Sequence, residues 1–137
     1  GVGNNLFAPK ADTTRGMLMT VLARYAGQDT TGGSVWYEKG MNWAKANGVS
    51  DGTNPTASIT REQLVTMLWR YAGEPAGTAS LDGFNDASTV SSYAVTAMRW
   101  AVENGIINGA NGSLNPRNNA SRAEVAAILM RFCEMGK

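Results

Sequence analysis

The feature that most constrains this chain is an internal repeat. When the sequence is aligned on Arg15, Arg61 and Arg122, a hydroxyl residue precedes each arginine and a proline stands six residues before it. Nine residues after each comes another arginine, and ten residues after it an aromatic residue. The matched residues are Thr14, Thr60 and Ser121; Pro9, Pro55 and Pro116; Arg24, Arg70 and Arg131; and Tyr25, Tyr71 and Phe132. A chain of 137 residues with such copies is expected to form small units that share one core.

Each copy has the pattern of an amphipathic helix. Apolar residues stand three, six and seven residues after the aligned arginine, and with the aromatic at ten they form one helix face. Ser121–Glu124 and Thr60–Gln63 fit the capping box, with a hydroxyl at the N-cap and Glu or Gln at position N3. The first copy keeps its N-cap, Thr14, and loses the box. The sequence therefore predicts three helices of about three turns that start at the aligned arginines.

A second helix is predicted before two of the three copies. Trp36–Asn47 and Tyr93–Asn104 align at a constant offset and share a methionine, a Trp-Ala pair and a final Asn-Gly. Glycine takes the left-handed conformation freely, so Asn-Gly is a natural helix end. The unit is thus helix, proline loop, helix, and the first copy lacks the leading helix. We expect half a repeat to expose an apolar helix face, covered by an upstream segment, a second chain or a swapped element.

Composition excludes several classes of function. Twelve Lys and Arg against eleven Asp and Glu give a net charge of +1, too balanced for broad contact with nucleic acid. Without histidine and with Cys133 as the one cysteine, the chain has no His-dependent triad, His/Cys zinc site or internal disulfide. A metal held only by carboxylates and carbonyls stays open. We expect no cofactor, and no membrane insertion because no apolar run approaches the roughly 18 to 20 residues of a membrane helix.

These motifs together resemble the S-layer homology (SLH) domain. The resemblance rests on the Trp-Ala helix, the Asn-Gly-Val or Asn-Gly-Ile turn, the proline loop and the Thr-Arg-Glu or Ser-Arg-Ala-Glu helix start. Phe84-Asn85-Asp86 resembles the Phe-x-Asp opening of that family, whereas Asp29 lacks the phenylalanine. The resemblance places the second half of one repeat at 1–28 and full repeats at 29–74 and 82–137.

The resemblance also implies a fold and a function. The fold would be all-α, with tandem repeats in a pseudo-threefold arrangement around a central three-helix bundle. The protein would be secreted and held at the bacterial cell surface without catalysis. Grooves between repeats would bind secondary cell-wall polysaccharide, often with a pyruvylated amino-sugar end.

The aligned arginines are the first candidates for ligand contact. Arg15, Arg61 and Arg122 each stand at the start of a helix, where the N–H groups and the dipole already favour an anion. A forked guanidinium suits the carboxylate of an acidic sugar, and the helix amides would add to the attraction. The alternative is an ion pair with an acid of a neighbouring repeat. We rank Arg61 and Arg122 ahead of Arg15, since the truncated first repeat could leave its groove without one wall.

Six further residues are candidates for ligand contact: Trp43, Trp100, Asp29, Asp86, Gly52 and Gly109. The tryptophans could stack on sugar rings or pack in the core. The aspartates could accept sugar hydroxyls, although capping of a loop is slightly favoured. The glycines are better explained by turn geometry. Arg24, Arg70 and Arg131 lie near helix C-termini, where a structural role against the dipole is the better explanation.

Two other functions compete with wall binding. A helical scaffold could bind protein or build a lattice through the face left open by the half repeat. A glycosidase would need two paired carboxylates, and nothing in the sequence pairs two acids convincingly. We therefore predict a binding module and not an enzyme.

Overall fold

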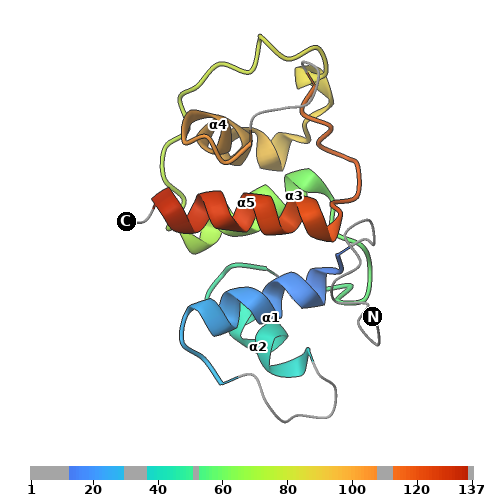
Figure 1. Cartoon of the computed structure of the whole chain (residues 1–137), viewed down its shortest axis with the longest axis vertical. Helices are drawn as coiled ribbons and strands as arrows, with labels where there is room; N and C mark the ends of the chain where they lie inside the picture. Colours follow the sequence, from blue (N-terminus) through green and yellow to red (C-terminus); the bar gives the residue numbers. More distant parts are fainter. Residues whose placement is uncertain (1–12, 30–36, 51–52, 108–112, 136–137) are drawn as a thin grey trace.

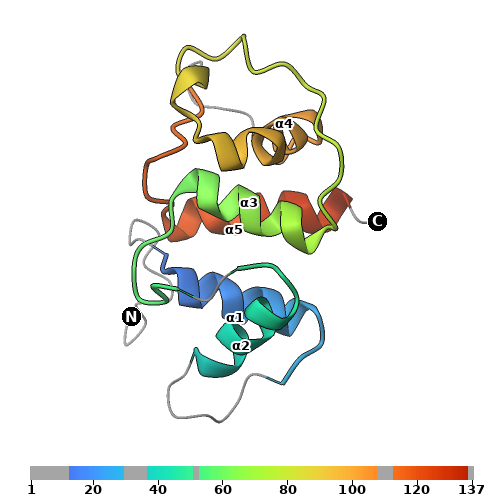
Figure 2. The same cartoon turned by 180° about the vertical axis from the view of Figure 1, so that it is seen from behind.

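The computed structural model describes residues 13–29, 37–50, 53–107 and 113–135 of the chain. Within these ranges the chain forms five α-helices and two short 3-10 turns, with no strand. The helices are α1 (Arg15–Tyr25), α2 (Glu38–Ala46), α3 (Arg61–Tyr71), α4 (Val95–Glu103) and α5 (Arg122–Met135) (Figures 1 and 2). The prediction of an all-α fold is confirmed.

Hydroxyl side chains start α1, α3 and α5 at the three aligned arginines. Thr14 Oγ1 accepts a hydrogen bond of 3.2 Å from the N–H three residues later. In α3, Thr60 and Gln63 make both bonds of a capping box. In α5, Ser121 and Glu124 make the same two bonds, at 2.9 and 3.1 Å. Both predicted boxes are confirmed, and each satisfies N–H groups that a helix start leaves without partners.

A closed ring of backbone hydrogen bonds joins the N-terminal ends of α1, α3 and α5. Thr13, Ile59 and Ala120 occupy the same position, two residues before the aligned arginines. Thr13 donates to Ala120, Ala120 donates to Ile59, and Ile59 donates back to Thr13, at N···O distances of 3.0, 2.9 and 2.8 Å. Each unit thus bonds to both of the others. This ring is the pseudo-threefold arrangement that the resemblance implied.

Three aromatic rings close the opposite end of the same helices. Tyr25, Tyr71 and Phe132 contact one another, with ring centroids 6.0 to 6.4 Å apart in tilted or edge-on geometries that favour aromatic packing. Because equivalent residues meet at both ends, α1, α3 and α5 run parallel as a central bundle. Leucine side chains fill the space between the ends, and these are fully buried: Leu18, Leu22, Leu64 and Leu68.

The leading helices α2 and α4 lie outside this bundle. α2 packs on α1 and α4 packs on α3, so they lie at opposite ends of the long axis (Figures 1 and 2). At the contact between α2 and α1, a Cβ on Gly40 would come within 2.8 Å of Thr20 backbone atoms. Glycine therefore allows the two helices to approach closely.

Both leading helices end at the predicted Asn-Gly. The side-chain amides of Asn47 and Asn104 each donate to the carbonyl four residues earlier at 2.9 Å. Gly48 and Gly105 follow with φ of 70° and 71°, the left-handed conformation. The starts differ from the prediction: α2 begins at Glu38, and a 3-10 turn at Ser92–Ala94 precedes α4.

α2 covers one face of α1, and the equivalent face of α5 is exposed. Met19 and Ala23 of α1 are completely buried, whereas the equivalent residues of α5, Ala126 and Met130, are exposed, Met130 by 59%. The apolar face expected from the half repeat is therefore found on α5. The reason is that each leading helix packs on the central helix of the preceding unit. None of the described helices is long and apolar enough to cross a membrane.

Candidate functional site

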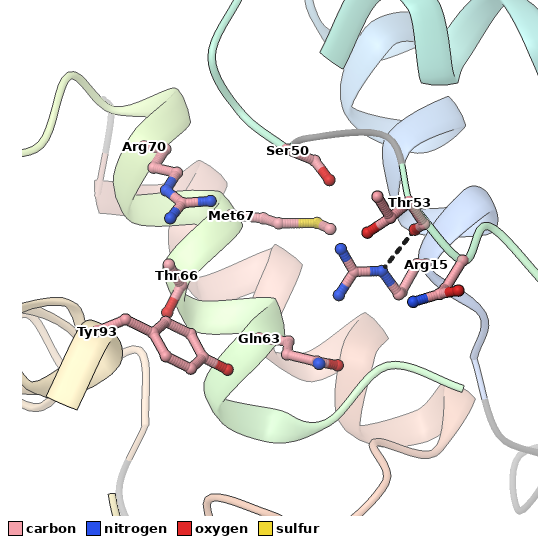
Figure 3. Close-up of a pocket in the computed structure, with 9 residues that line it drawn as sticks. Arg15, Ser50, Thr53, Gln63, Thr66, Met67, Arg70 and Tyr93 are labelled. Atoms are coloured by element: carbon pink, nitrogen blue, oxygen red, sulfur yellow. Dashed lines mark hydrogen bonds between the residues drawn. The ribbon is translucent and has the colours of Figure 1, made fainter. Parts of the chain in front are cut away.

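A polar pocket of about 380 Å³ lies between α1, α3 and the loop that precedes α3 (Figure 3). Its described walls are Arg15, Ser50, Thr53, Asn54, Gln63, Thr66, Met67, Arg70 and Tyr93. We call these residues the Arg15 pocket. None of them is acidic, and two carry a guanidinium. The described part of the wall thus combines two positive charges with hydroxyl and amide groups, which suits an anionic ligand.

Arg15 enters this pocket from the start of α1. Its Nε donates to the carbonyl oxygen of Thr53 at 3.0 Å, and its guanidinium extends between Ser50 and Gln63 (Figure 3). The bond to a loop carbonyl orients the planar group. An oriented guanidinium loses less entropy when it binds a carboxylate than a free side chain would.

Arg70 lies on the same wall of α3, one turn after Thr66. Its guanidinium makes no hydrogen bond or ion pair with any residue that the structure describes. From the sequence we assigned Arg70 a structural role near the helix C-terminus. Helical periodicity could have predicted that Arg70 lines the pocket. Four pocket residues stand at i, i+3, i+4 and i+7 of one helix face: Gln63, Thr66, Met67 and Arg70.

Tyr93 forms the far wall and is held by a buried carboxylate. Glu62, 4% exposed, accepts hydrogen bonds from the Tyr93 hydroxyl at 3.2 Å and from the Ser91 N–H and hydroxyl at 2.9 and 2.6 Å. Burial and the nearby Glu62 charge raise the pKa of Tyr93, so the phenol stays neutral. Glu62 thus ties the segment before α4 to α3 and keeps this wall in place.

Arg61 occupies the equivalent position in α3, but an internal acid holds it. Its Nε donates to the Leu114 carbonyl at 2.9 Å, as Arg15 does to Thr53, and its Nη1 forms an ion pair with Glu124. We call Arg61, Leu114 and Glu124 the Arg61 site. The Arg61 side chain is only 11% exposed. The structure thus places it in the ion pair between repeats that the sequence left as the alternative.

The pKa of Glu124 reflects this pairing. Burial alone would raise it, but the Ser121 N–H and the Arg61 charge outweigh that effect, so the pKa lies below its ordinary value. Glu124 is therefore ionised at neutral pH and compensates the charge of Arg61.

Arg122 lies in a third environment, against α1. Its Nη2 is 3.6 Å from the Met17 sulfur, and its Nε and Nη1 are buried with no hydrogen-bond partner among the residues that the structure describes. The loop position equivalent to Thr53 and Leu114 is Phe7, which lies outside the described residues. Arg122 lines a mainly apolar pocket of about 230 Å³ with Thr13, Met17, Leu18, Val21, Val125, Ala126 and Leu129.

The first amide N–H groups of α1 and α3 are hydrogen-bonded within the protein, whereas the sequence analysis expected them to add to the attraction for an anion. The N–H groups of Arg15 and Gly16 donate to loop carbonyls of the next repeat at 3.0 and 2.7 Å, and those of Arg61 and Glu62 do so at 3.0 and 2.8 Å. These amides are therefore already satisfied. Anion binding at these helix starts has to come from side chains.

The candidate tryptophans pack against aromatic residues. Trp100 is 2% exposed and lies edge-on to Phe132 at 6.1 Å, so it has the core role that the sequence left open. Trp43 is half-buried and packs against Tyr71 at 5.8 Å. Neither tryptophan lines the Arg15 pocket.

The two remaining candidates that the structure describes, Asp86 and Asp29, do not line the pocket. Both carboxylate oxygens of Asp86 accept backbone N–H bonds of 2.8 Å from Leu114 and Asn115, which closes the loop of its own repeat. Asp29 is exposed, and Gly52 and Gly109 lie outside the described residues. No group of three or more His, Cys, Asp or Glu side chains is placed to hold a metal within the described part of the chain.

Comparison with known proteins agrees with this architecture. Residues 83–126 match the family model of the S-layer homology domain. Over 58 residues, 42% of the chain, the sequence is 41% identical to the Surface-layer 125 kDa protein of Lysinibacillus sphaericus. The chain spans 5% of the length of that relative. The resemblance inferred from the motifs is confirmed, and the chain carries an S-layer homology domain over residues 83–126.

Proposed function

We propose that this chain is a non-catalytic module that anchors a secreted protein to the bacterial cell wall by binding an anionic secondary cell-wall polysaccharide in the Arg15 pocket. The observation that carries the proposal is a pocket of about 380 Å³ with two guanidinium groups and no acid among its described walls. The SLH match and the surface-layer relative support a location at the cell surface.

Different pocket side chains bind different groups of the polysaccharide. The guanidiniums of Arg15 and Arg70 donate charge-assisted hydrogen bonds to a carboxylate, such as that of a pyruvyl ketal or a uronic acid. Ser50, Asn54 and Gln63 exchange hydrogen bonds with sugar hydroxyls. Each bond to a charged group contributes about 1.5 to 3 kcal/mol, so one pocket gives modest affinity and a repetitive polymer increases it by multivalency.

The test compares two forms of one polymer. Wall polysaccharide purified from Lysinibacillus sphaericus is immobilised either intact or after chemical reduction of its carboxyl groups to alcohols. We expect the chain to be retained on the intact polymer and to elute freely from the reduced one. Equal retention on both would rule out recognition of an anion, and absence of retention on either would rule out the proposed function with this polymer.

A helical scaffold is the second candidate, and the open face of α5 favours it. This face carries the exposed Ala126 and Met130 at positions that are buried in α1. The occupant we propose is an amphipathic helix of the α2 and α4 pattern, supplied upstream or by a second chain. If the face binds such a helix, Met130→Glu lowers the apparent mass in sedimentation or weakens the binding of a peptide with the α4 sequence.

A further inference from the structure

Tyr93 is the one aromatic side chain among the described walls of the Arg15 pocket. It belongs to the 3-10 turn before α4, which packs on α3, and the residue is 49% exposed. Figure 3 shows its ring across the pocket from the Arg15 guanidinium. An exposed aromatic ring offers a flat apolar surface. The pocket therefore joins such a surface to walls that are mostly polar or positively charged.

A buried carboxylate holds the phenol end of this ring. The Tyr93 hydroxyl donates to Glu62 Oε2 at 3.2 Å, and Glu62 is 4% exposed and is not among the described walls of the pocket. Glu62 also accepts from the Ser91 N–H at 2.9 Å and from the Ser91 hydroxyl at 2.6 Å, which fixes its own position. A tyrosine has few side-chain torsions, and this bond restricts them before a ligand arrives. The ring therefore loses little conformational entropy on binding.

The ring and the two guanidiniums lie close enough to contact one ligand. Burial has the largest influence on the pKa of Tyr93 and raises it, and the Glu62 charge raises it further. The charges of Arg15 and Arg70 act in the opposite direction, and such effects weaken with distance, so both cations lie near the phenol. The neutral phenol does not repel an anion. A sugar acid carries a carboxylate on a ring whose C–H groups form an apolar face, and this ligand matches the combination.

We propose that the Tyr93 ring is the surface on which the apolar face of a wall sugar packs while the sugar's carboxylate meets the guanidiniums, and that Glu62 is the positioning residue of this ring. The inference rests on the proposed function, because it takes the anionic polymer as the ligand of the Arg15 pocket. It adds a specificity: the pocket prefers a carboxylate carried on a sugar ring to a small carboxylate such as acetate.

The first experiment removes the aromatic face. Tyr93→Leu keeps an apolar side chain without a flat ring, and Tyr93→Phe keeps the ring without the hydroxyl. Calorimetric titration with intact wall polysaccharide should show a loss of affinity of at least about tenfold for Tyr93→Leu and of at most about threefold for Tyr93→Phe. The matched control is Tyr25→Leu, since Tyr25 is 53% exposed and does not line the pocket. Its affinity should equal that of the wild type, and thermal unfolding checks that each variant is folded.

A second measurement uses the wild-type chain, so it does not depend on the folding of a variant. NMR signals of isotope-labelled tyrosine rings are followed while a short fragment of the polysaccharide is added. The Tyr93 signals should shift with saturation, and those of Tyr25 should stay in place. Acetate should bind at least about tenfold more weakly than the fragment. Unmoved Tyr93 signals with the fragment bound would overturn the inference.

The role of Glu62 is tested through its bond to the hydroxyl. Glu62→Gln replaces one accepting oxygen by an amide donor. It should weaken binding about threefold in the wild-type chain and leave binding unchanged in the Tyr93→Phe chain, which lacks the hydroxyl. A purely structural role would weaken binding equally in both chains. Equal losses, or no loss in either chain, would therefore overturn the positioning role.

The outcomes separate this inference from the proposed function. If the wild-type chain prefers the intact polymer to the carboxyl-reduced one, while Tyr93→Leu binds like the wild type, the inference is wrong and the proposed function stands. If Tyr93→Phe weakens binding as much as Tyr93→Leu does, the hydroxyl and not the ring face is recognised, and the inference is again wrong. If the wild-type chain does not bind the polymer at all, both are wrong.

Discussion

The Arg15 pocket and the Arg61 site are built on one backbone plan and have different electrostatics. In both, an arginine at a helix start donates from Nε to a loop carbonyl of the next repeat, at 3.0 and 2.9 Å. In one, the neighbouring N3 side chain is an amide, and in the other it is a carboxylate that forms an ion pair. The comparison teaches that the repeat preserves the scaffold, while single side chains change the charge beside the aligned arginine.

The largest expected effect is on the Arg15 pocket. Arg15→Ala with Arg70→Ala removes both guanidiniums from the pocket. Each contributes about 1.5 to 3 kcal/mol to a charged hydrogen bond, so we expect at least about a hundredfold loss of affinity for intact wall polysaccharide. Calorimetric titration measures it.

The matched control removes one positive charge elsewhere. Arg99 is an exposed arginine of α4 that does not line the Arg15 pocket. Arg99→Ala should leave affinity within about twofold of wild type at moderate salt, because separated surface charges are screened. If Arg99→Ala weakens binding as much as the double variant does, net charge and not the pocket explains the affinity.

The Arg61 site should respond in stability and not in binding. Arg61→Ala leaves the Glu124 carboxylate without its partner and removes the bond to Leu114. We expect a loss of about 1 to 2 kcal/mol in the free energy of unfolding, because Glu124 is partly exposed and water replaces part of the interaction. Chemical denaturation measures it. A double-mutant cycle with Glu124→Gln isolates the pair, and a coupling of zero would show that the ion pair contributes nothing.

The smallest expected effect is on pH dependence. The folded-state pKa of Glu124 lies below the ordinary value of 4.5, so its contribution to stability is present above that pH and is lost as pH falls through the folded pKa. The wild-type chain should therefore lose its advantage over Glu124→Gln below about pH 4.5. Thermal unfolding of both chains between pH 3 and 7 follows this difference. An advantage that grows on acidification would contradict the assignment.

Local features of this fold were predictable because local chemistry determines them. The capping residues Thr60 and Ser121 and the helix ends at Gly48 and Gly105 act on backbone groups within four residues. The amphipathic stripe identified the central helices, and the resemblance to the S-layer homology domain implied their pseudo-threefold relation.

The site was only partly predictable because its contacts cross between repeats. Glu124 was recognised as a capping residue, but its ion pair with Arg61 depends on how α5 packs beside α3. The packing of α1 beside α3 places Arg70 in a pocket with Arg15, which the sequence ranked last of the three aligned arginines. Sequence spacing within one helix carries no information on which neighbour lies across the interface.

The most direct test of this account follows the arginine side chains themselves. NMR signals of the Nε–H groups of Arg15, Arg61 and Arg70 are recorded while a short fragment of intact wall polysaccharide is added. The account predicts that the Arg15 and Arg70 signals shift with saturation and that the Arg61 signal stays in place. A saturating shift of Arg61, with Arg15 and Arg70 unmoved, would contradict it.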